Sequence, residues 1–359
     1  MRDKDKAAHR LEGLELQEGW RVVRKLESGK VGTGGVYSAY YEATDGERAG
    51  FLKAFDYSDE DKATQDKSKL LENTTTAFNY EKLILSLCTE RGIKGVVRLL
   101  STGWVDVPDA SYPRVEYLIL EFGEGGDCRE MLDNPQANLR WKLKSLHQVA
   151  SGLNQLHAAG IAHQDIKPSN IVNDRKGASR ISDFGSAYLK NYSGSIPEHL
   201  TKSHCGTYAY APPELLYGFK GDFEIRRRAC DAYLLGSLIA FYFSRTPMNS
   251  LIQKNLDPRL SWTQHENQGH FDEVKEYVSD AFAKAVNDFT LDLEDGTPEL
   301  APEDRESLAM CVQYLCNPSP YDRGHPKTIN ERGSNYSLTR FVSILSRLAK
   351  KYDWKVPTA

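Results

Sequence analysis

Residues 163–170 read HQDIKPSN, and residues 183–185 read DFG a short way downstream. Together the two stretches bring two aspartates, an asparagine and a lysine into one part of the chain. Phosphoryl transfer needs a carboxylate that orients the attacking hydroxyl, oxygen ligands for Mg²⁺ and a cation that offsets charge on the moving phosphate. The residue types present therefore indicate magnesium-assisted phosphoryl transfer.

Each of these four polar side chains has a role in such a reaction. Asp165 would accept the proton of the attacking hydroxyl, and Lys167 would offset the charge of the phosphate. Asn170 and Asp183 would hold Mg²⁺, which prefers hard oxygen donors completed by phosphate and water. The order and spacing of the two stretches disfavour the alternative, a polar loop followed by a chance DFG.

The sequence resembles the protein kinase superfamily from about Gly29 to Arg323. Residues 163–170 are similar to the catalytic loop of that family, except that Gln164 stands where the family has arginine. The DFG at residues 183–185 matches the family's metal-binding stretch unchanged. The resemblance implies ATP as the phosphate donor, Mg²⁺ as a cofactor and a protein as the substrate. It also implies a bilobal α+β fold, with a β-rich N-lobe that holds one main helix and an α-helical C-lobe.

A glycine-rich stretch, GKVGTGGV at residues 29–36, lies near the start of the expected N-lobe. Glycines let a hairpin tip approach phosphates, with backbone N–H groups pointing at the anion. Gly29, Gly34 and Val36 match the family's G-x-G-x-x-G-x-V, and Gly32 lies one position after the place of the second glycine. We expect this loop to cover the phosphates of ATP.

A lysine in an apolar, strand-like run follows in FLKAF, residues 51–55. By resemblance Lys53 would contact the α- and β-phosphates of ATP, and a helix glutamate would hold it in place. We assign that glutamate to Glu81, in the helix expected near residues 74–88. The alternatives are a surface lysine on an edge strand and a glutamate on a solvated helix face.

The stretch LEFG, residues 120–123, resembles the hinge between kinase lobes. The resemblance implies that the backbone from Glu121 to Gly123 hydrogen-bonds adenine, with Leu120 behind it as the gatekeeper. Asp127 is a candidate for binding the ribose hydroxyls. A plain linker between the lobes is the alternative.

A second family signature, GTYAYAPPE, occupies residues 206–214. By resemblance Thr207 would contact Asp165 and the catalytic-loop lysine. Glu214 would form a buried ion pair with Arg323, because a buried charge without a partner is costly. Downstream, an aspartate opens an apolar helix that begins near residue 230, and we expect Asp231 to be its N-cap and to anchor the catalytic loop.

The chain divides by the character of its residues. Residues 1–19 are rich in charge and indicate a flexible N-terminal tail, and residues 20–122 read mainly as strands, the N-lobe. Residues 123–126 form the hinge, and residues 127–354 read mainly as helices, the C-lobe. An insertion at about residues 253–303 contains an amphipathic helix, which we expect to pack on the C-lobe rather than to bind a partner.

Composition narrows the class of protein further. A net charge of -4 gives none of the basic excess expected of a nucleic-acid-binding protein. No apolar run approaches the roughly 18 residues of a membrane span. Six cysteines are scattered through 359 residues, which indicates reduced thiols and a cytoplasmic location. We therefore expect neither nucleic-acid nor membrane binding.

Three functions remain open: an active serine/threonine protein kinase, a small-molecule kinase, and a pseudokinase that only binds. Lys167, Thr207 and the Pro-Glu at residues 213–214 favour a protein kinase over a small-molecule kinase, and the run KPSN favours serine or threonine over tyrosine. A pseudokinase is disfavoured because the residues of metal and base chemistry are all present: Lys53, Asp165, Asn170 and Asp183.

The neutral Gln164 has a consequence for regulation. In kinases with arginine there, a phosphate on the activation segment neutralises a cluster of cations and orders the segment. An uncharged amide gives a phosphate nothing to neutralise, so the sequence predicts activity that does not depend on phosphorylation of the segment. The alternative is that Lys190 or Lys202 supplies the missing charge.

Overall fold

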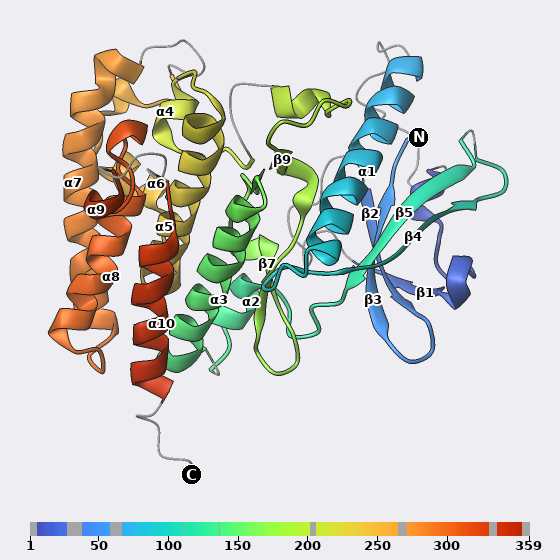
Figure 1. Cartoon of the computed structure of the whole chain (residues 1–359), viewed down its shortest axis with the longest axis horizontal. Coiled ribbons are helices and arrows are strands. Elements are labelled where there is room, and N and C mark those ends of the chain that lie inside the picture. Colours follow the sequence, from blue (N-terminus) through green and yellow to red (C-terminus); the bar gives the residue numbers. More distant parts are fainter. Residues whose placement is uncertain are drawn as a thin grey trace.

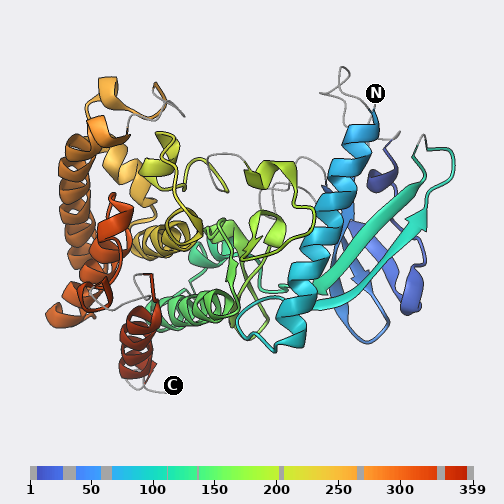
Figure 2. The same ribbon diagram turned by 45° about the horizontal axis from the view of Figure 1, so that its top comes forward.

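The computed structural model of the chain describes residues 6–26, 38–57, 67–110, 112–135, 137–201, 206–264, 271–329 and 336–353. Over these ranges the chain forms a sheet-rich N-lobe, on the right in Figure 1, and a larger helical C-lobe on the left. The same two lobes are separate in the turned view of Figure 2. The bilobal α+β fold predicted from the sequence is confirmed.

The N-lobe is built on an antiparallel sheet whose strand order is β1-β2-β3-β5-β4 over the described residues. Its elements are β1 (Arg21–Lys25), β2 (Ser38–Thr44), β3 (Ala49–Phe55), α1 (Lys67–Glu90), β4 (Leu99–Asp106) and β5 (Arg114–Glu121). A hairpin at Asp45-Gly46 joins β2 to β3, and Gly46 has the positive φ of 91° that such a turn favours. In both ribbon views α1 lies between this sheet and the C-lobe.

The expectation of a flexible tail is wrong for the described part of the N-terminus, residues 6–19. Ala8 and Leu11 are buried against the sheet, and the Tyr41 hydroxyl donates a hydrogen bond of 2.8 Å to the Ala8 carbonyl. Trp20 belongs to the same cluster of buried apolar residues as Ala8 and Leu11. The segment packs because its few apolar residues cover the outer face of the sheet, which removes apolar surface from water. Residues 1–5 lie outside the described residues.

The C-lobe is mainly helical, as predicted. Its helices are α2 (Cys128–Leu132), α3 (Leu139–Ala158), α4 (Pro213–Leu216), α5 (Ala229–Ser244), α6 (Met248–Asn255), α7 (Phe271–Gly296), α8 (Pro302–Leu315), α9 (Pro326–Ile329) and α10 (Thr339–Asp353). Two short strand pairs carry the loops that face the N-lobe: β6 (Ile161–Ala162) with β9 (Tyr188–Leu189), and β7 (Ile171–Asn173) with β8 (Ser179–Ile181). Residues 163–170 connect β6 to β7, and residues 183–185 lie between β8 and β9, so the pairing of β6 with β9 and of β7 with β8 brings the two stretches together.

Helix α5 is the centre of the C-lobe. Nearly all of its residues are buried, which explains why its sequence is apolar on every face. Helix α7, which holds the insertion's amphipathic pattern, buries Phe271, Val278 and Phe282 and lies at the far edge of the lobe in Figure 1. The apolar face of the insertion packs on the C-lobe, as the sequence predicted. Among the helices of the described residues, none combines the length and apolar character that crossing a bilayer requires.

The cysteines correct one expectation. Four of them are buried free thiols: Cys88, Cys128, Cys311 and Cys316. Cys230, however, is disulfide-bonded, so the expectation of reduced thiols is wrong at this position. A disulfide depends on how close two cysteines lie in space, which their separation along the chain does not reveal. Cys205 lies outside the described residues.

The predicted ion pair between Glu214 and Arg323 forms inside the C-lobe. Arg323 is fully buried, and its two terminal nitrogens donate to the two carboxylate oxygens of Glu214 at 2.7 and 2.8 Å. The guanidinium also donates to the carbonyls of Ala229 and Asn317. The pair therefore ties α4 to α5 and to the segment before α9.

We predict that Glu214→Ala lowers the free energy of unfolding by about 3–5 kcal/mol, because it leaves the Arg323 guanidinium buried without a counter-charge. Chemical denaturation of both proteins measures the difference. Glu303→Ala is the matched control, since that glutamate forms an exposed ion pair with Lys351 and its loss should change stability little. An unfolding midpoint for Glu214→Ala that equals that of the control would contradict the structural role of the pair.

Candidate active site

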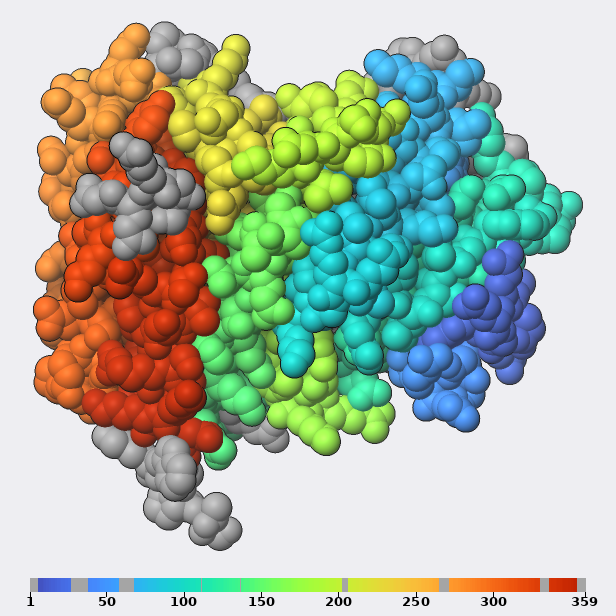
Figure 3. Space-filling model, viewed as in Figure 1, coloured from blue at the N-terminus to red at the C-terminus, as the bar shows by residue number. Residues whose placement is uncertain are grey.

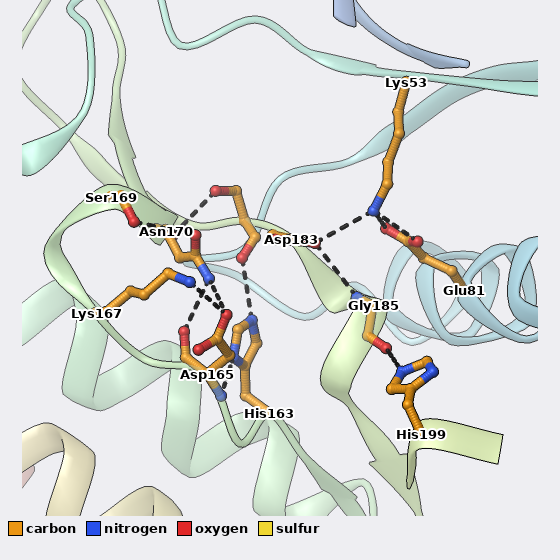
Figure 4. Close-up of polar contacts among 11 residues, drawn as sticks. Lys53, Glu81, His163, Asp165, Lys167, Ser169, Asn170, Asp183, Gly185 and His199 are labelled. Atoms are coloured by element: carbon orange, nitrogen blue, oxygen red, sulfur yellow. Dashed lines mark hydrogen bonds and ion pairs between the residues drawn. The ribbon is translucent and has the colours of Figure 1, made fainter. Parts of the chain in front are cut away.

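The catalytic-loop carboxylate, Asp165, is held by three donors, of which Lys167 and Asn170 are drawn in Figure 4. Its Oδ2 atom accepts from Lys167 Nζ at 2.8 Å and from Asn170 Nδ2 at 2.9 Å. Its Oδ1 atom accepts from the backbone N–H of Thr207 at 2.9 Å, and the Thr207 hydroxyl accepts from Lys167 at 2.6 Å. The structure therefore brings together four residues that the sequence assigned to the site.

The backbone near Gly206 permits the contact between Thr207 and Asp165. Gly206 has a φ of 53°, and a Cβ atom there would lie 2.3 Å from the Gln164 carbonyl oxygen and 2.7 Å from Asp165 Oδ1. Only a glycine satisfies both the left-handed conformation and this close approach. The glycine of GTYAYAPPE is thus needed for the activation segment, residues 183–214, to reach the catalytic loop.

A buried carboxylate on α5 anchors the backbone of the catalytic loop. Asp231 accepts from the backbone N–H of His163 at 2.8 Å and from that of Gln164 at 2.6 Å. The predicted anchoring contact is present, but the predicted N-cap is wrong, because Arg228 occupies the N-cap of α5 and Asp231 lies in its first turn. The carboxylate points to the loop instead of to the free N–H groups of its own helix.

The buried side chains of Lys53 and Glu81 and the half-buried Asp183 form a charged group at the junction of β3, α1 and the DFG stretch (Figure 4). The Lys53 ammonium donates to both carboxylate oxygens of Glu81 at 2.9 Å and to Asp183 Oδ1 at 3.2 Å. The predicted pairing of Lys53 with Glu81 is present. The next residue, Phe184, is buried, and its ring meets the ring of His163 edge-on at 5.0 Å.

The charges of this group stabilise each other. Burial by itself would lower the pKa of Lys53, but attraction to Glu81 and Asp183 outweighs burial and raises that pKa above its usual value. Burial would raise the pKa of Asp183, yet Lys53 and Lys167 lower it below its usual range. Asp183 is therefore an ionised carboxylate at neutral pH, the state in which it can bind a metal ion.

The donor set fits a magnesium ion that is completed by phosphate. Asn170 donates from its Nδ2 atom to Asp165, and its Oδ1 oxygen, which accepts a long hydrogen bond of 3.5 Å from the Ser169 hydroxyl, keeps a lone pair for a metal ion. Asn170 and Asp183 border the same cavity, and oxygen atoms of these two types are what Mg²⁺ prefers. No group of three or more His, Cys, Asp or Glu side chains in the described ranges could hold a metal by itself. A cation here would need the phosphates of a nucleotide.

A cavity of about 450 Å³ between the lobes is large enough for a nucleotide. Its lining includes the residues predicted for the hinge and for the phosphate and metal contacts: Lys53, Glu81, Leu120, Glu121, Gly123, Asp127, Asn170 and Asp183. The N-lobe contributes Phe51 and Val97, and the C-lobe contributes Val172. Apolar walls with a few charged groups at one end are typical of a site for a flat ring that carries phosphates.

Asp127 is placed at the cavity as predicted, but its carboxylate is already engaged. One oxygen accepts from the backbone N–H groups of Arg129 and Glu130, which caps α2, and the other accepts from the Arg129 guanidinium at 2.6 Å. Glu130, which the sequence reasoning missed, borders the same cavity and is exposed. Nothing in its sequence context distinguished it from an ordinary surface glutamate of a short helix.

The glycine-rich loop, with Gly29, Gly32, Gly34 and Val36, lies outside the described residues. Its role in covering the phosphates stays a prediction.

Two contacts that the sequence did not predict join α1 to the activation segment. The Tyr80 hydroxyl accepts from the backbone N–H of Leu189 at 2.9 Å, and Asn73 donates to the Glu198 carboxylate at 3.2 Å. On the face drawn in Figure 3, the activation segment lies between α1 and the rest of the C-lobe. Because Tyr80 precedes Glu81, the segment and the Lys53 group share one helix. A tyrosine in a helix gives no sequence signal for such a contact.

The chain belongs to the protein kinase family: the family model for the protein kinase domain matches residues 20–326. It is 29% identical to the serine/threonine-protein kinase chk1 of Schizosaccharomyces pombe over 181 residues, which are 50% of this chain and 34% of that protein. It is 39% identical to the serine/threonine-protein kinase grp of Drosophila melanogaster over 106 residues, 28% of this chain and 20% of that protein. An Aurora kinase of Dictyostelium discoideum is 32% identical over 146 residues, 39% of this chain and 34% of that protein. The matched segments thus span about a third or less of these relatives.

We predict that Asp183→Asn weakens the binding of ATP at least tenfold in the presence of Mg²⁺, because the substitution removes a charged metal ligand. Calorimetric titration of both proteins with ATP and excess Mg²⁺ measures the difference. The same titration in a chelator is the control, and there the two proteins should differ much less. Equal affinities of the two proteins for ATP with Mg²⁺ would show that Asp183 is not a ligand.

Proposed function

We propose that this protein is a kinase that uses ATP and Mg²⁺ to phosphorylate serine or threonine residues of another protein. One observation carries the proposal: the Asp165 carboxylate is held by Lys167, Asn170 and Thr207 beside a cavity that also contains Lys53 and Asp183. A base, a phosphate-binding lysine and two oxygen ligands are thereby gathered at one place.

The geometry supports a direct transfer. Asp165 would accept the proton of the serine or threonine hydroxyl while the hydroxyl oxygen forms a bond to the γ-phosphorus of ATP. The bond between the γ-phosphorus and its bridging oxygen breaks, and ADP leaves with the electron pair. Lys167, which lies 2.8 Å from Asp165 Oδ2, offsets negative charge on the phosphoryl group. Asn170 and Asp183 would hold Mg²⁺, which supplies positive charge against the phosphate oxygens.

The contact of Thr207 favours a protein substrate over a small molecule. Thr207 belongs to the activation segment and is bonded to both Asp165 and Lys167. A polypeptide that lies along residues 207–212 would therefore present its hydroxyl next to the base. The relatives named serine/threonine-protein kinases support the same class of substrate.

The state of the site favours catalysis over binding alone. Lys53 is paired with Glu81, Asp183 faces Lys53, and the DFG phenylalanine is buried. A pseudokinase would need no base, yet Asp165 is present and oriented by three donors.

We also propose a cytoplasmic location. The four buried free thiols support this location, and the disulfide of Cys230 does not.

We predict that Asp165→Asn lowers kcat by roughly 10²- to 10⁴-fold, since it removes the proton acceptor and keeps the shape of the side chain. Transfer of labelled phosphate from ATP to a generic basic protein measures the rate. Affinity for ATP and the melting temperature should stay close to those of the wild type.

Asp106→Asn is the matched control for this experiment, because Asp106 is an exposed aspartate at the end of β4. Its kcat should equal that of the wild type. If the Asp165 variant turns over at a near-normal rate, another group is the base and the proposed mechanism is wrong.

A further inference from the structure

The C-lobe contains an arginine that the sequence did not single out. Arg227 lies in a π-helical turn, Glu224–Arg228, that leads into α5. The triplet Arg226–Arg228 reads in the sequence as a solvated face, with a substrate-steering patch as the less favoured interpretation. Instead Arg227 is only 5% exposed. A charged side chain this deep in a protein needs specific partners, because burial of a lone charge is costly.

The partners of Arg227 come from three segments that are far apart in the sequence. Its Nη1 atom donates to Oε1 of Gln164 in the catalytic loop, and its Nη2 atom donates to the carbonyl of Leu200 in the activation segment at 2.6 Å. The guanidinium also lies over the ring of Tyr188 in β9, with Cζ 4.3 Å from the ring centre. Arg227 thus joins the catalytic loop to two places in the activation segment, the Tyr188 ring and the Leu200 carbonyl.

Gln164 completes the connection from the other side. Its Nε2 atom donates to the carbonyl of Ser186 at 2.7 Å, while its backbone N–H is bound by Asp231. Its backbone has a positive φ of 65°, which is uncommon for a residue with a side chain. The amide therefore bonds the start of the activation segment directly and the Leu200 region through Arg227.

Arg227 remains a cation although none of its hydrogen-bond partners among the described residues is a carboxylate. Burial, followed by repulsion from Arg226, lowers the pKa of Arg227 to about 10, which still leaves it protonated at neutral pH. Neutral acceptors bound to a charged donor form strong hydrogen bonds, and the Tyr188 ring adds a cation–π contact. Such contacts hold a buried cation only while both carbonyl partners stay in place.

We infer that Arg227 is a positioning residue that keeps the activation segment against the catalytic loop, in place of a phosphate on that segment. This inference rests on the proposed kinase function. Gln164 precedes the base Asp165, and Leu200 precedes the stretch that leads to Thr207. A shift at either end of the Arg227 contact therefore displaces a group that orients the base.

The sequence offered two other lysines, Lys190 and Lys202, as sources of positive charge near Gln164. Lys190 Nζ is 2.7 Å from a Glu224 carboxylate oxygen, so its charge is neutralised by that glutamate. Lys202 lies outside the described residues. Arg227 is a cation next to Gln164, but its two terminal nitrogens already donate to Gln164 and to the Leu200 carbonyl, so it holds the segment without a phosphate.

The first experiment compares Arg227→Met, Gln164→Met and the double variant with the wild type. Each single change should lower kcat at least tenfold, equivalent to about 1.4 kcal/mol in the barrier. The KM for ATP should stay within twofold, because neither residue is among those that line the cavity between the lobes. The loss in the double variant should be smaller than the product of the two single losses, because the two changes share the contact between Gln164 and Arg227 although each also breaks a contact of its own.

Arg226→Met is the matched control. Its guanidinium has two buried nitrogens without a hydrogen-bond partner, so its removal breaks no bond to the catalytic loop and should change kcat less than twofold. Losses that multiply in the double variant, or a kcat for Arg227→Met equal to that of the control, would overturn the inference. If Arg227→Met fails to fold, Gln164→Met decides, since it removes the acceptor and keeps the cation.

The second experiment removes phosphate. Phosphatase treatment of the wild-type protein should leave its initial rate on a protein substrate within twofold, because Arg227 holds the segment without a phosphate. A fall of tenfold or more would overturn the inference.

A third measurement separates this inference from the proposed function. Amide hydrogen exchange of residues 186–201 should be faster in Arg227→Met than in Arg226→Met, whether or not the protein transfers phosphate. A wild type without phosphotransfer contradicts the proposed function and leaves this comparison valid. Equal exchange in the two variants overturns the positioning role itself.

Discussion

The ammonium of Lys53 joins the two lobes through its ion pairs with Glu81 and Asp183. It is buried, so it must be neutralised, and its two carboxylate partners come from α1 and from the DFG stretch. Once Glu81 is fixed by this pair, α1 is fixed as well, and the same helix presents Tyr80 and Asn73 to the activation segment. One buried charge thus fixes the position of α1, of the DFG aspartate and of part of the activation segment.

The C-lobe uses buried charges in the same way. Asp231 binds two backbone N–H groups of the catalytic loop, and Arg323 pairs with Glu214 below the activation segment. Arg227 extends this pattern to the catalytic loop and the Leu200 carbonyl. Each of these charges lies on or beside α5, whose apolar sequence fills the centre of the lobe. The loops that carry the chemistry are therefore attached to the most deeply buried helix by contacts that are costly to break.

The sequence predicted the site residues that belong to short motifs. Asp165, Asn170 and Asp183 could be placed because their spacing is constrained by the reaction itself, and Glu81 could be placed because the family resemblance implies a helix glutamate that pairs with the strand lysine. The ion pair of Glu214 with Arg323 followed from the rule that buried charges occur together.

The features that the sequence did not predict depend on contacts between distant segments. Ala8 and Leu11 are apolar residues within a charged stretch, and only the outer face of the sheet explains why they pack. Arg227 reads as one of three exposed arginines, because its partners Gln164 and Leu200 lie at distant positions in the chain. For Asp231, the anchoring of the catalytic loop was predicted and is present, whereas the predicted N-cap is wrong because α5 has Arg228 at its N-cap.

Transfer of phosphate to protein hydroxyls at this site can be followed through the fate of the γ-phosphate of ATP. The purified protein is incubated with labelled ATP, Mg²⁺ and a generic basic protein, and the labelled amino acids are then identified after hydrolysis. The account predicts label on phosphoserine and phosphothreonine and none on phosphotyrosine. Tight binding of ATP and Mg²⁺ with no label on any protein would contradict it.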